Sequence, residues 1–162
     1  MFGLGTPEND AIELLKTDHK LVDELFDEYE GRKEEGKRAG KAIIAQQICN
    51  ALTIHATIEE EIFYPAVRKH VKEAGDLIDE AAVEHQTLKD IIARLQAAPT
   101  DDPLRDAGVK VLGEYVKHHV KEEESELFPK VRASGLDLEA LGNQLRARRA
   151  ELEGGRSKRR TA

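Results

Sequence analysis

Two stretches of the chain, 66 residues apart, carry the same apolar stripe with a histidine at its centre. The first stripe consists of Ile12, Leu15, His19, Val22, Phe26 and Tyr29, and the second of Ile78, Ala81, His85, Leu88, Ile92 and Leu95. Steps of three and four residues give a period of about 3.5, which is typical of a helix face packed inside a bundle. The repeated stripe therefore predicts two equivalent helices in one core and indicates an internal duplication.

A second repeat has an offset of 64 residues. The segment from His55 to Pro65 matches the segment from His119 to Pro129, with His, Glu and Pro at equivalent positions. Apolar residues continue both copies at helical spacing: Ile44, Ile48, Ala51, Ile62 and Ala66 in the first, and Leu112, Val116 and Leu127 in the second. Two helix-turn-helix halves related by a pseudo-twofold axis are the simplest architecture. The predicted fold class is all-α, an up-down four-helix bundle.

Composition and turn residues define the expected boundaries. Good helix formers dominate the sequence and only 4% of the 162 residues are aromatic, which favours helices over strands. Capping, Gly and Pro signals predict helices at about residues 6–31, 41–74, 76–98 and 102–133, and a shorter amphipathic helix at about 136–152. We expect residues 1–133 to form the bundle domain, and residues 134–162 to form a short helix with a disordered basic tail.

Charge and cysteine usage exclude several classes of function. The net charge of the chain is −7. From residue 146 onward, seven basic and two acidic residues give +5, so the rest of the chain carries −12. An acidic body argues against nucleic acid as a partner. The single cysteine excludes an internal disulfide and a thiolate metal cluster. Neither a signal peptide nor a membrane-spanning run is evident, so we expect a cytoplasmic protein without a membrane partner.

The histidines and glutamates of the stripes point to a metal centre. A His and a Glu four residues apart lie about 40° apart on a helix, so both face the core. A buried carboxylate without a partner is costly, and the stripes contain no Lys or Arg. Six ligands exceed the four of a tetrahedral zinc site and suit two metal ions, for which iron, manganese or zinc all qualify. The candidate metal ligands are His19, His55, Glu59, His85, His119 and Glu123.

In this order and with this duplication, the motifs resemble those of the hemerythrin-like, or HHE cation-binding, family. The matching pieces are Asp18-His19, His55-x-x-x-Glu59, Glu84-His85 and His119-x-x-x-Glu123, which span roughly residues 8–133. The resemblance implies an up-down bundle holding two iron ions joined by an oxo or hydroxo bridge, with zinc or manganese as the less expected occupants. It also implies that the four histidines are terminal ligands and that Glu59 and Glu123 are bridges.

One departure from the family's oxygen carriers bears on function. Those proteins have a fifth histidine one turn from the third-helix ligand, whereas Ala81 and Lys89 occupy the corresponding positions around His85. Metal positions left open favour redox chemistry, so we expect oxidant detoxification by reaction with peroxide or O2, in the manner of a catalase or peroxidase. The alternatives are an O2, NO or iron binding or sensing protein without turnover, and an iron-repair or iron-donor protein. The expected partner is a small oxidant: H2O2, O2 or NO.

Neighbouring acidic and histidine residues leave alternatives open. Glu124 is an alternative to Glu123 as a bridge, although the repeat favours Glu123. His118 lies about 100° round the helix from the ligand direction, so we expect it to face solvent. Asp18 and Glu84 either hydrogen-bond the metal-binding histidines or lie exposed. A solvated face is expected for Glu61, Glu122 and Glu126.

The tyrosines and two prolines have simpler expected roles. Tyr29, Tyr64 and Tyr115 are expected to pack in the core or at an interface, with contact to a bound oxygen species as the alternative. Pro65 and Pro129 each lack a backbone N–H, so we expect them to kink or end the helices below the site.

Overall fold

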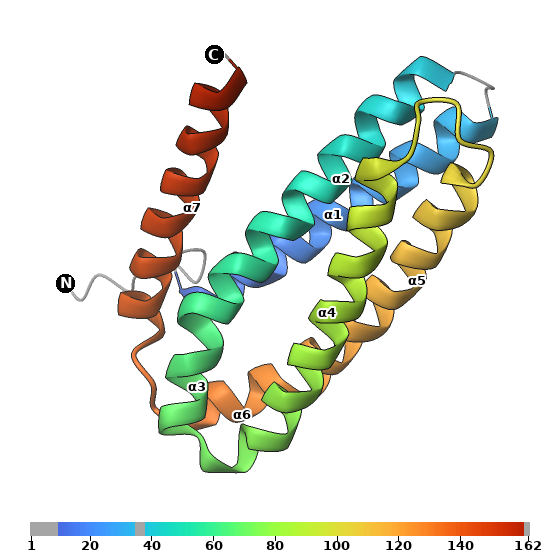
Figure 1. Ribbon diagram of the computed structural model, residues 1–162. Helices are drawn as coiled ribbons and strands as arrows, with labels where there is room; N and C mark the ends of the chain where they lie inside the picture. Colours follow the sequence, from blue (N-terminus) through green and yellow to red (C-terminus); the bar gives the residue numbers. More distant parts are fainter. Residues whose placement is uncertain (1–9, 35–37, 161–162) are drawn as a thin grey trace.

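The computed structural model describes residues 10–34 and 38–160, whose regular secondary structure is helical with no strand (Figure 1). The helices are α1 (Ala11–Glu34), α2 (Arg38–Ile58), α3 (Tyr64–His70), α4 (Gly75–Ala97), α5 (Arg105–Glu122), α6 (Phe128–Ala133) and α7 (Leu138–Arg160). Two π-helical turns, Glu59–Phe63 and Glu123–Leu127, and a 3-10 turn, Lys72–Ala74, join some of them. The predicted all-α fold class is confirmed. Within the described ranges, no helix is both long and apolar enough to cross a membrane.

The helices form two hairpins that close into a four-helix bundle (Figure 1). Helix α1 packs against α2, α2 against α4, α4 against α5, and α5 against α1, which is the up-down arrangement that the duplication predicts. The run from α2 through α3 forms one long rod, and so does the run from α5 through α6. Below, the α1–α3 half means residues 11–70 and the α4–α6 half means residues 75–133.

Both histidine stripes face the core as predicted. Ile12 and Leu15 are fully buried, and the corresponding residues of the second stripe, Ile78 and Ala81, are 3% and 4% exposed. The core consists of two apolar clusters, one near the α3–α6 end and one toward the opposite end of the bundle. The histidines and the two glutamates lie between these clusters. A polar layer is thus enclosed by apolar packing on both sides.

The prolines begin new helical segments and do not end the helical run. Ahead of Pro65, the N–H of Tyr64 donates to the carbonyl of Glu59, and ahead of Pro129, the N–H of Phe128 donates to the carbonyl of Glu123. These bonds span five residues, as in a π-helix. Each proline then lies in the first turn of α3 or α6, where a missing N–H leaves no intrahelical bond unmade.

The π turn changes which side chains of the second helix face inward. The expected stripe continued from Glu59 to Ile62 and Ala66, and both residues pack against the core cluster, although they are only partly buried. Phe63 and Tyr64 are 0% and 4% exposed. The extra residue in the turn places these two side chains in the core, on the side that Glu59 faces.

Helix α7 is longer than the expected helix at residues 136–152, because its backbone stays helical through residue 160 where a disordered tail was expected. Asp137 accepts a hydrogen bond from the N–H of Ala140 at 3.0 Å, which satisfies an N-terminal donor of the helix. Leu141 and Leu145, 5% and 0% exposed, join the core cluster at the α3–α6 end. The helix leans away from the bundle toward its C-terminal end (Figure 1). The expected helix start at residues 6–8 lies outside the described residues.

Candidate metal centre

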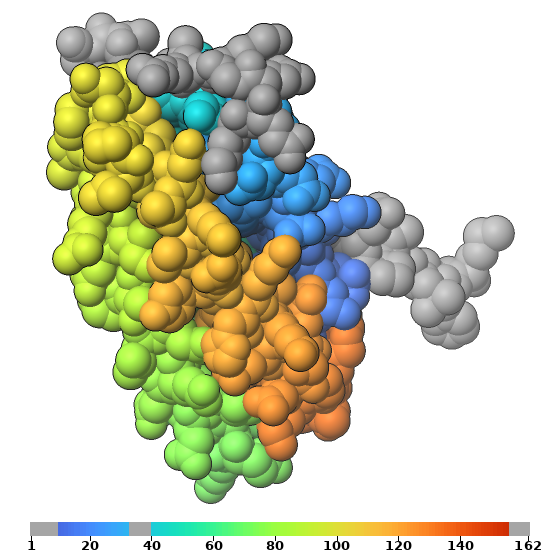
Figure 2. Space-filling model, turned by 90° about the vertical axis from the view of Figure 1, so that its right-hand side faces the viewer, coloured from blue at the N-terminus to red at the C-terminus, as the bar shows by residue number. Residues whose placement is uncertain are grey.

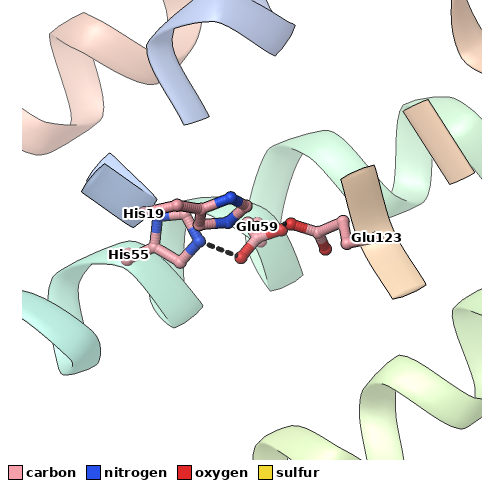
Figure 3. A group of neighbouring side chains, drawn as sticks. All are labelled: His19, His55, Glu59 and Glu123. Carbon is pink, nitrogen blue, oxygen red and sulfur yellow. Dashed lines mark ion pairs between the residues drawn. The ribbon is translucent and has the colours of Figure 1, made fainter. Parts of the chain in front are cut away.

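Four of the predicted ligands converge inside the bundle, from α1, α2 and the two π turns (Figure 3). They are His19, His55, Glu59 and Glu123, and one nitrogen or oxygen atom from each lies within 4.8 Å of the others. Nε2 of His55 lies 2.5 Å from Oε1 of Glu59. Nε2 of His19 lies 3.1 Å from Oε1 of Glu123. Each histidine nitrogen thus lies beside a carboxylate oxygen, and the two could act as neighbouring ligands of one cation.

The remaining two predicted ligands form a second group that shares Glu59 with the first. Atoms of His85, His119 and Glu59 lie within 4.8 Å of one another. The two Nε2 atoms are 3.1 Å apart, and Oε1 of Glu59 lies 3.8 Å from Nε2 of His85. Glu123 also reaches this group, because its Oε2 lies 3.5 Å from Nε2 of His119. All six predicted residues therefore come together in two groups, with both glutamates between them.

The centre is buried and its polar atoms are not satisfied by protein partners. Glu59 is 0% exposed and Glu123 is 3% exposed. Within the described ranges, seven buried side-chain N or O atoms lack a hydrogen-bond partner, and six of them belong to the first group. Leaving carboxylates and imidazoles in this state costs several kcal/mol each, in order of magnitude. Bound metal cations would satisfy them, so the residues fit a metal pair.

Proton affinities in the centre indicate the same demand for positive charge. Burial opposes the charged form of His55, but the charge of Glu59 and the hydrogen bond with Asp18 raise its pKa to about 10. Burial likewise opposes charge on His119, but contact with Glu123 raises its pKa to about 11. Burial acts to raise the pKa of Glu123, whereas its histidine neighbours hold it well below the usual value. Without metal, protons on His55 and His119 supply positive charge beside the carboxylates.

Asp18 and Glu84, which precede His19 and His85 in the sequence, bind the outer ring nitrogens of His55 and His119. Nδ1 of His55 donates to Oδ2 of Asp18 at 2.8 Å, and Nδ1 of His119 donates to Oε1 of Glu84 at 3.1 Å. These equivalent contacts decide between the two readings of Asp18 and Glu84 in favour of hydrogen bonding. Because Nδ1 is held in this way, Nε2 of each ring faces the centre.

Glu60 and Glu124, which follow the buried Glu59 and Glu123, contact the outer nitrogens of His85 and His19. Oε2 of Glu60 lies 3.3 Å from Nδ1 of His85, and Oε1 of Glu124 lies 3.4 Å from Nδ1 of His19. Hydrogen bonding to His85 lowers the pKa of Glu60 to about 2, aided by Lys89, whose Nζ lies 2.6 Å from its Oε1. Glu124 therefore lies outside His19 and not between the histidine groups. The 64-residue repeat relates Glu60 to Glu124 and was the available sequence signal for these contacts.

Tyr64, which the sequence analysis expected to pack in the core or at an interface, is buried beside the centre. Its hydroxyl donates to Oε2 of Glu123 at 2.5 Å and lies 3.3 Å from Nε2 of His85. Burial and the charges of Glu59 and Glu123 raise the pKa of this phenol well above its usual value. The equivalent residue of the other half is Phe128, whose ring stacks on His19 with the ring centroids 6.0 Å apart. The two histidine groups thus differ by one hydroxyl.

Other candidates lie outside the centre. The side chain of His118 is 62% exposed, so its expected solvent-facing position is confirmed. Tyr29 is fully buried and donates to Oδ1 of Asp106 at 2.6 Å, in agreement with a packing role. Tyr115 is 48% exposed and does not pack in the core of this chain.

A groove between α1 and α5 leads from the surface to one edge of the centre. It has a volume of about 760 Å³ and reaches His19 and Glu124. Phe26, Val116 and Val120 contribute its apolar lining. Figure 2 shows α1 (blue) and α5 (orange) next to each other on this face. The rim carries basic residues from both helices: Lys16, Lys20, Lys110, Lys117 and Lys121.

The bundle and the buried His and Glu side chains together define a helical cation-binding protein. The chain belongs to the family described as Hemerythrin HHE cation binding domain, which matches residues 10–131. It is similar to a crystal structure of a hemerythrin HHE cation binding domain-containing protein from Mycobacterium kansasii, a homolog of Rv2633c. The TM-score is 0.73 at 25% identity, over 90% of this chain and 88% of that chain.

Two further relatives differ in length from each other. The protein Rv2633c of Mycobacterium tuberculosis is 26% identical over 89% of this chain and 88% of its own length. A DNA nickase of Nostoc sp. (strain PCC 7120) is 29% identical over 87% of this chain, which spans only 39% of that relative. The similarity to the nickase is therefore confined to part of that protein.

Proposed function

We propose that this chain holds two iron ions between its four histidines and two glutamates and reacts with hydrogen peroxide or O2 as an oxidant-detoxifying protein. The observation that carries the proposal is the set of buried, unsatisfied nitrogen and oxygen atoms arranged in two groups that share Glu59. Such an iron pair supplies reversible transfer of electrons to a small oxidant. Membership of a cation-binding family supports the metal, and the missing fifth histidine supports redox turnover over oxygen storage.

The chain's own residues would hold the pair in a fixed frame. His19 and His55 would bind one ion, and His85 and His119 the other. Glu59 and Glu123 lie near both groups and would be shared. Each Nδ1 lies within 3.4 Å of a carboxylate oxygen, which favours the tautomer that presents Nε2 as a ligand.

Tyr64 would hold a proton beside the metals. Its buried hydroxyl donates to Glu123, and its raised pKa keeps the phenol protonated at neutral pH. A proton donor at this atom could protonate an oxygen species reduced at the centre. Since the position equivalent to Tyr64 is Phe128, this proton lies on the His85 side of the centre.

The groove between α1 and α5 supports access by a small molecule. His19 is among the residues that line the groove, so a small neutral oxidant such as peroxide could reach this edge of the centre without crossing the core. The remaining inner space is small, because the other cavity that contacts the same histidines has a volume of only about 30 Å³. Larger organic substrates are therefore not favoured.

The proposal is tested by loading the protein with ferrous iron, measuring iron per chain, and recording the optical spectrum in air. We expect about two irons per chain, charge-transfer absorption in the near ultraviolet, and rapid consumption of added peroxide. The control is His70→Gln, which removes an exposed histidine that belongs to neither histidine group and should behave like the unmodified protein. Two irons without peroxide consumption, but with reversible binding of O2 or NO, would overturn the enzymatic part and favour binding or sensing. Zinc, or less than one iron per chain, would overturn the iron pair.

A further inference from the structure

The outer surface of the α4–α6 half carries a second group of metal-binding side chain types. One atom from each of Glu84, His118 and Glu122 lies within 4.8 Å of the others. Nε2 of His118 lies 3.3 Å from Oε1 of Glu122 and 3.7 Å from Oε2 of Glu84. Glu80 adjoins them, and the charges of Glu122 and Glu84 raise its pKa. Three carboxylates and an imidazole therefore crowd one place on the surface.

This crowding is not relieved by basic residues. Within the described ranges, neither Glu84 nor Glu122 forms an ion pair with a Lys or Arg side chain, and His118 is their cationic neighbour. Like-charged carboxylates at this separation repel one another, and a bound cation is the usual means of bringing them together. Carboxylate and imidazole ligands suit divalent ions such as Fe²⁺, Mn²⁺ and Zn²⁺.

The equivalent surface of the α1–α3 half has no such group. By the repeat, Leu14, Ile54 and Ile58 stand where the other half has Glu80, His118 and Glu122. Leu14 and Ile58 are buried in the cluster that includes Leu141 and Leu145 of α7. At these three positions the acidic and histidine side chains belong to the α4–α6 half, whereas Asp18, the equivalent of Glu84, pairs with Arg149 of α7.

The surface group is connected to the metal centre. A cavity of about 10 Å³ is lined by Glu80, Glu84 and Glu122 and also by the buried His119 and Glu123. Glu84 belongs to both sites, because its Oε1 bonds to Nδ1 of His119 while its Oε2 faces His118. Glu123 is 3% exposed, its Oε1 lies 3.1 Å from Nε2 of His19, and its Oε2 accepts a hydrogen bond from Tyr64. A buried carboxylate of the inner centre therefore lines the inner end of this cavity.

We propose that Glu80, Glu84, His118 and Glu122 form a second cation site, which binds one divalent ion such as ferrous iron at the surface and passes it inward past Glu84. The binding part stands on the surface geometry alone. The delivery part rests on the proposed function, since it requires an inner metal pair as the destination. The ion keeps its charge in the transfer and exchanges its outer carboxylate and imidazole ligands for His119 and Glu123.

The binding part is tested with Mn²⁺ as the probe and iron-loaded protein as the sample. We expect one Mn²⁺ per chain to bind in addition to the iron, seen as loss of the paramagnetic resonance signal of free Mn²⁺. The double variant His118→Gln with Glu122→Gln should weaken this binding at least about tenfold. The matched control, His70→Gln with Glu126→Gln, removes an exposed histidine and an exposed glutamate elsewhere and should bind as the unmodified protein does. Equal Mn²⁺ binding by the unmodified protein and the His118/Glu122 double variant would overturn the site.

The delivery part is tested by adding ferrous iron to metal-free protein without oxygen and measuring the rate of incorporation. The His118/Glu122 double variant should load about tenfold more slowly, yet reach the same final iron content and optical spectrum. Unchanged loading with lost Mn²⁺ binding would overturn delivery and leave the surface site standing. If the protein instead binds Mn²⁺ at the surface but never holds an iron pair, the proposed function fails while the surface site survives.

Discussion

The α1–α3 and α4–α6 halves agree inside the bundle and differ outside it. Each half contributes two histidines and one buried glutamate. The same pattern of carboxylates holds the outer nitrogens of the histidines, as the contacts of Asp18 with His55 and of Glu84 with His119 illustrate. The proposed pair of metal ions would need equivalent surroundings on its two sides, and the repeat supplies them.

Outside the bundle, the same positions meet different surroundings. Arg149 of α7 pairs with Asp18, and Arg148 bonds to Glu61 at 2.7 Å, so α7 neutralises and covers the α1–α3 half. The equivalent Glu84 has His118 beside it and remains near solvent. The difference teaches that the sequence repeat specifies the buried His and Glu residues, whereas their solvent exposure and charged neighbours depend on residues that break the repeat.

The largest expected effect comes from removing a ligand that both histidine groups share. Glu59→Gln would eliminate one buried negative charge between the groups, so we expect most of the bound iron to be lost. Metal analysis after loading and desalting measures the loss. Glu126→Gln, an exposed glutamate in the π turn of the other half, is the control and should retain iron. Full iron content in Glu59→Gln would show that Glu59 is not a ligand.

The next effect tests the hydroxyl that distinguishes the two halves. Tyr64→Phe makes this position the same as Phe128, and we expect peroxide consumption to fall at least about tenfold, because a positioned proton donor is lost. Iron content should stay at the level of the unmodified protein. Steady-state peroxide assays together with metal analysis measure both quantities. If consumption is unchanged, Tyr64 does not serve as the proton donor.

A bulky side chain in the groove between α1 and α5 tests whether peroxide reaches the centre through this groove. Val120→Trp would fill the groove beside His19, so peroxide consumption should fall several-fold, about three- to tenfold, with unchanged iron content. Val111→Trp, at a valine that is 41% exposed on the same helix and does not line the groove, is the matched control. Equal rates in the two variants would mean that peroxide enters by another path.

The metal-free protein should lose stability as the solution becomes alkaline. The pKa of His55 is raised from 6.5 to about 10 in the folded state, so its contribution is fully present below pH 6.5 and is lost as pH rises toward 10. His119 behaves in the same direction, with a pKa of about 11. Urea unfolding across this range should show a falling free energy of unfolding, and His55→Gln should reduce the slope. A flat profile would contradict the protonated state of these histidines.

The smallest expected effect comes from removing Arg149, by which helix α7 pairs with Asp18 of the α1–α3 half. Arg149→Ala leaves Asp18 bound to His55 but removes its arginine partner, which should lower the free energy of unfolding by about 1 kcal/mol. Urea unfolding of the iron-loaded protein measures the change, and Arg94→Ala, at an exposed arginine of α4, provides the comparison. A loss within about 0.3 kcal/mol of the Arg94→Ala value would indicate that the apolar contacts of α7 alone hold the helix.

Helical periodicity was sufficient to predict the bundle and the inward positions of the histidines and of Glu59 and Glu123. Tyr64 packs in the core as expected, but a 3.6-residue period cannot anticipate a π turn, so the contact of its hydroxyl with Glu123 was not predicted. The sequence left open whether Asp18 and Glu84 hydrogen-bond histidines, because these bonds join different helices and the sequence does not give the distance between them. The length of helix α7 was underestimated because the glycines at 154 and 155 favour a helix end, yet the backbone stays helical through them.

The π turn at Glu59–Phe63 also has a consequence for the residues that follow it. If the same residues ran through this segment as an ordinary α-helix, every side chain after the turn would be rotated by about 100° about the axis relative to its present position. The Tyr64 phenol would then leave the centre, although neither Tyr64 nor any of the six His and Glu residues had been replaced. The conformation of the π turn, as much as the tyrosine itself, therefore decides whether a proton donor lies beside the proposed metal pair.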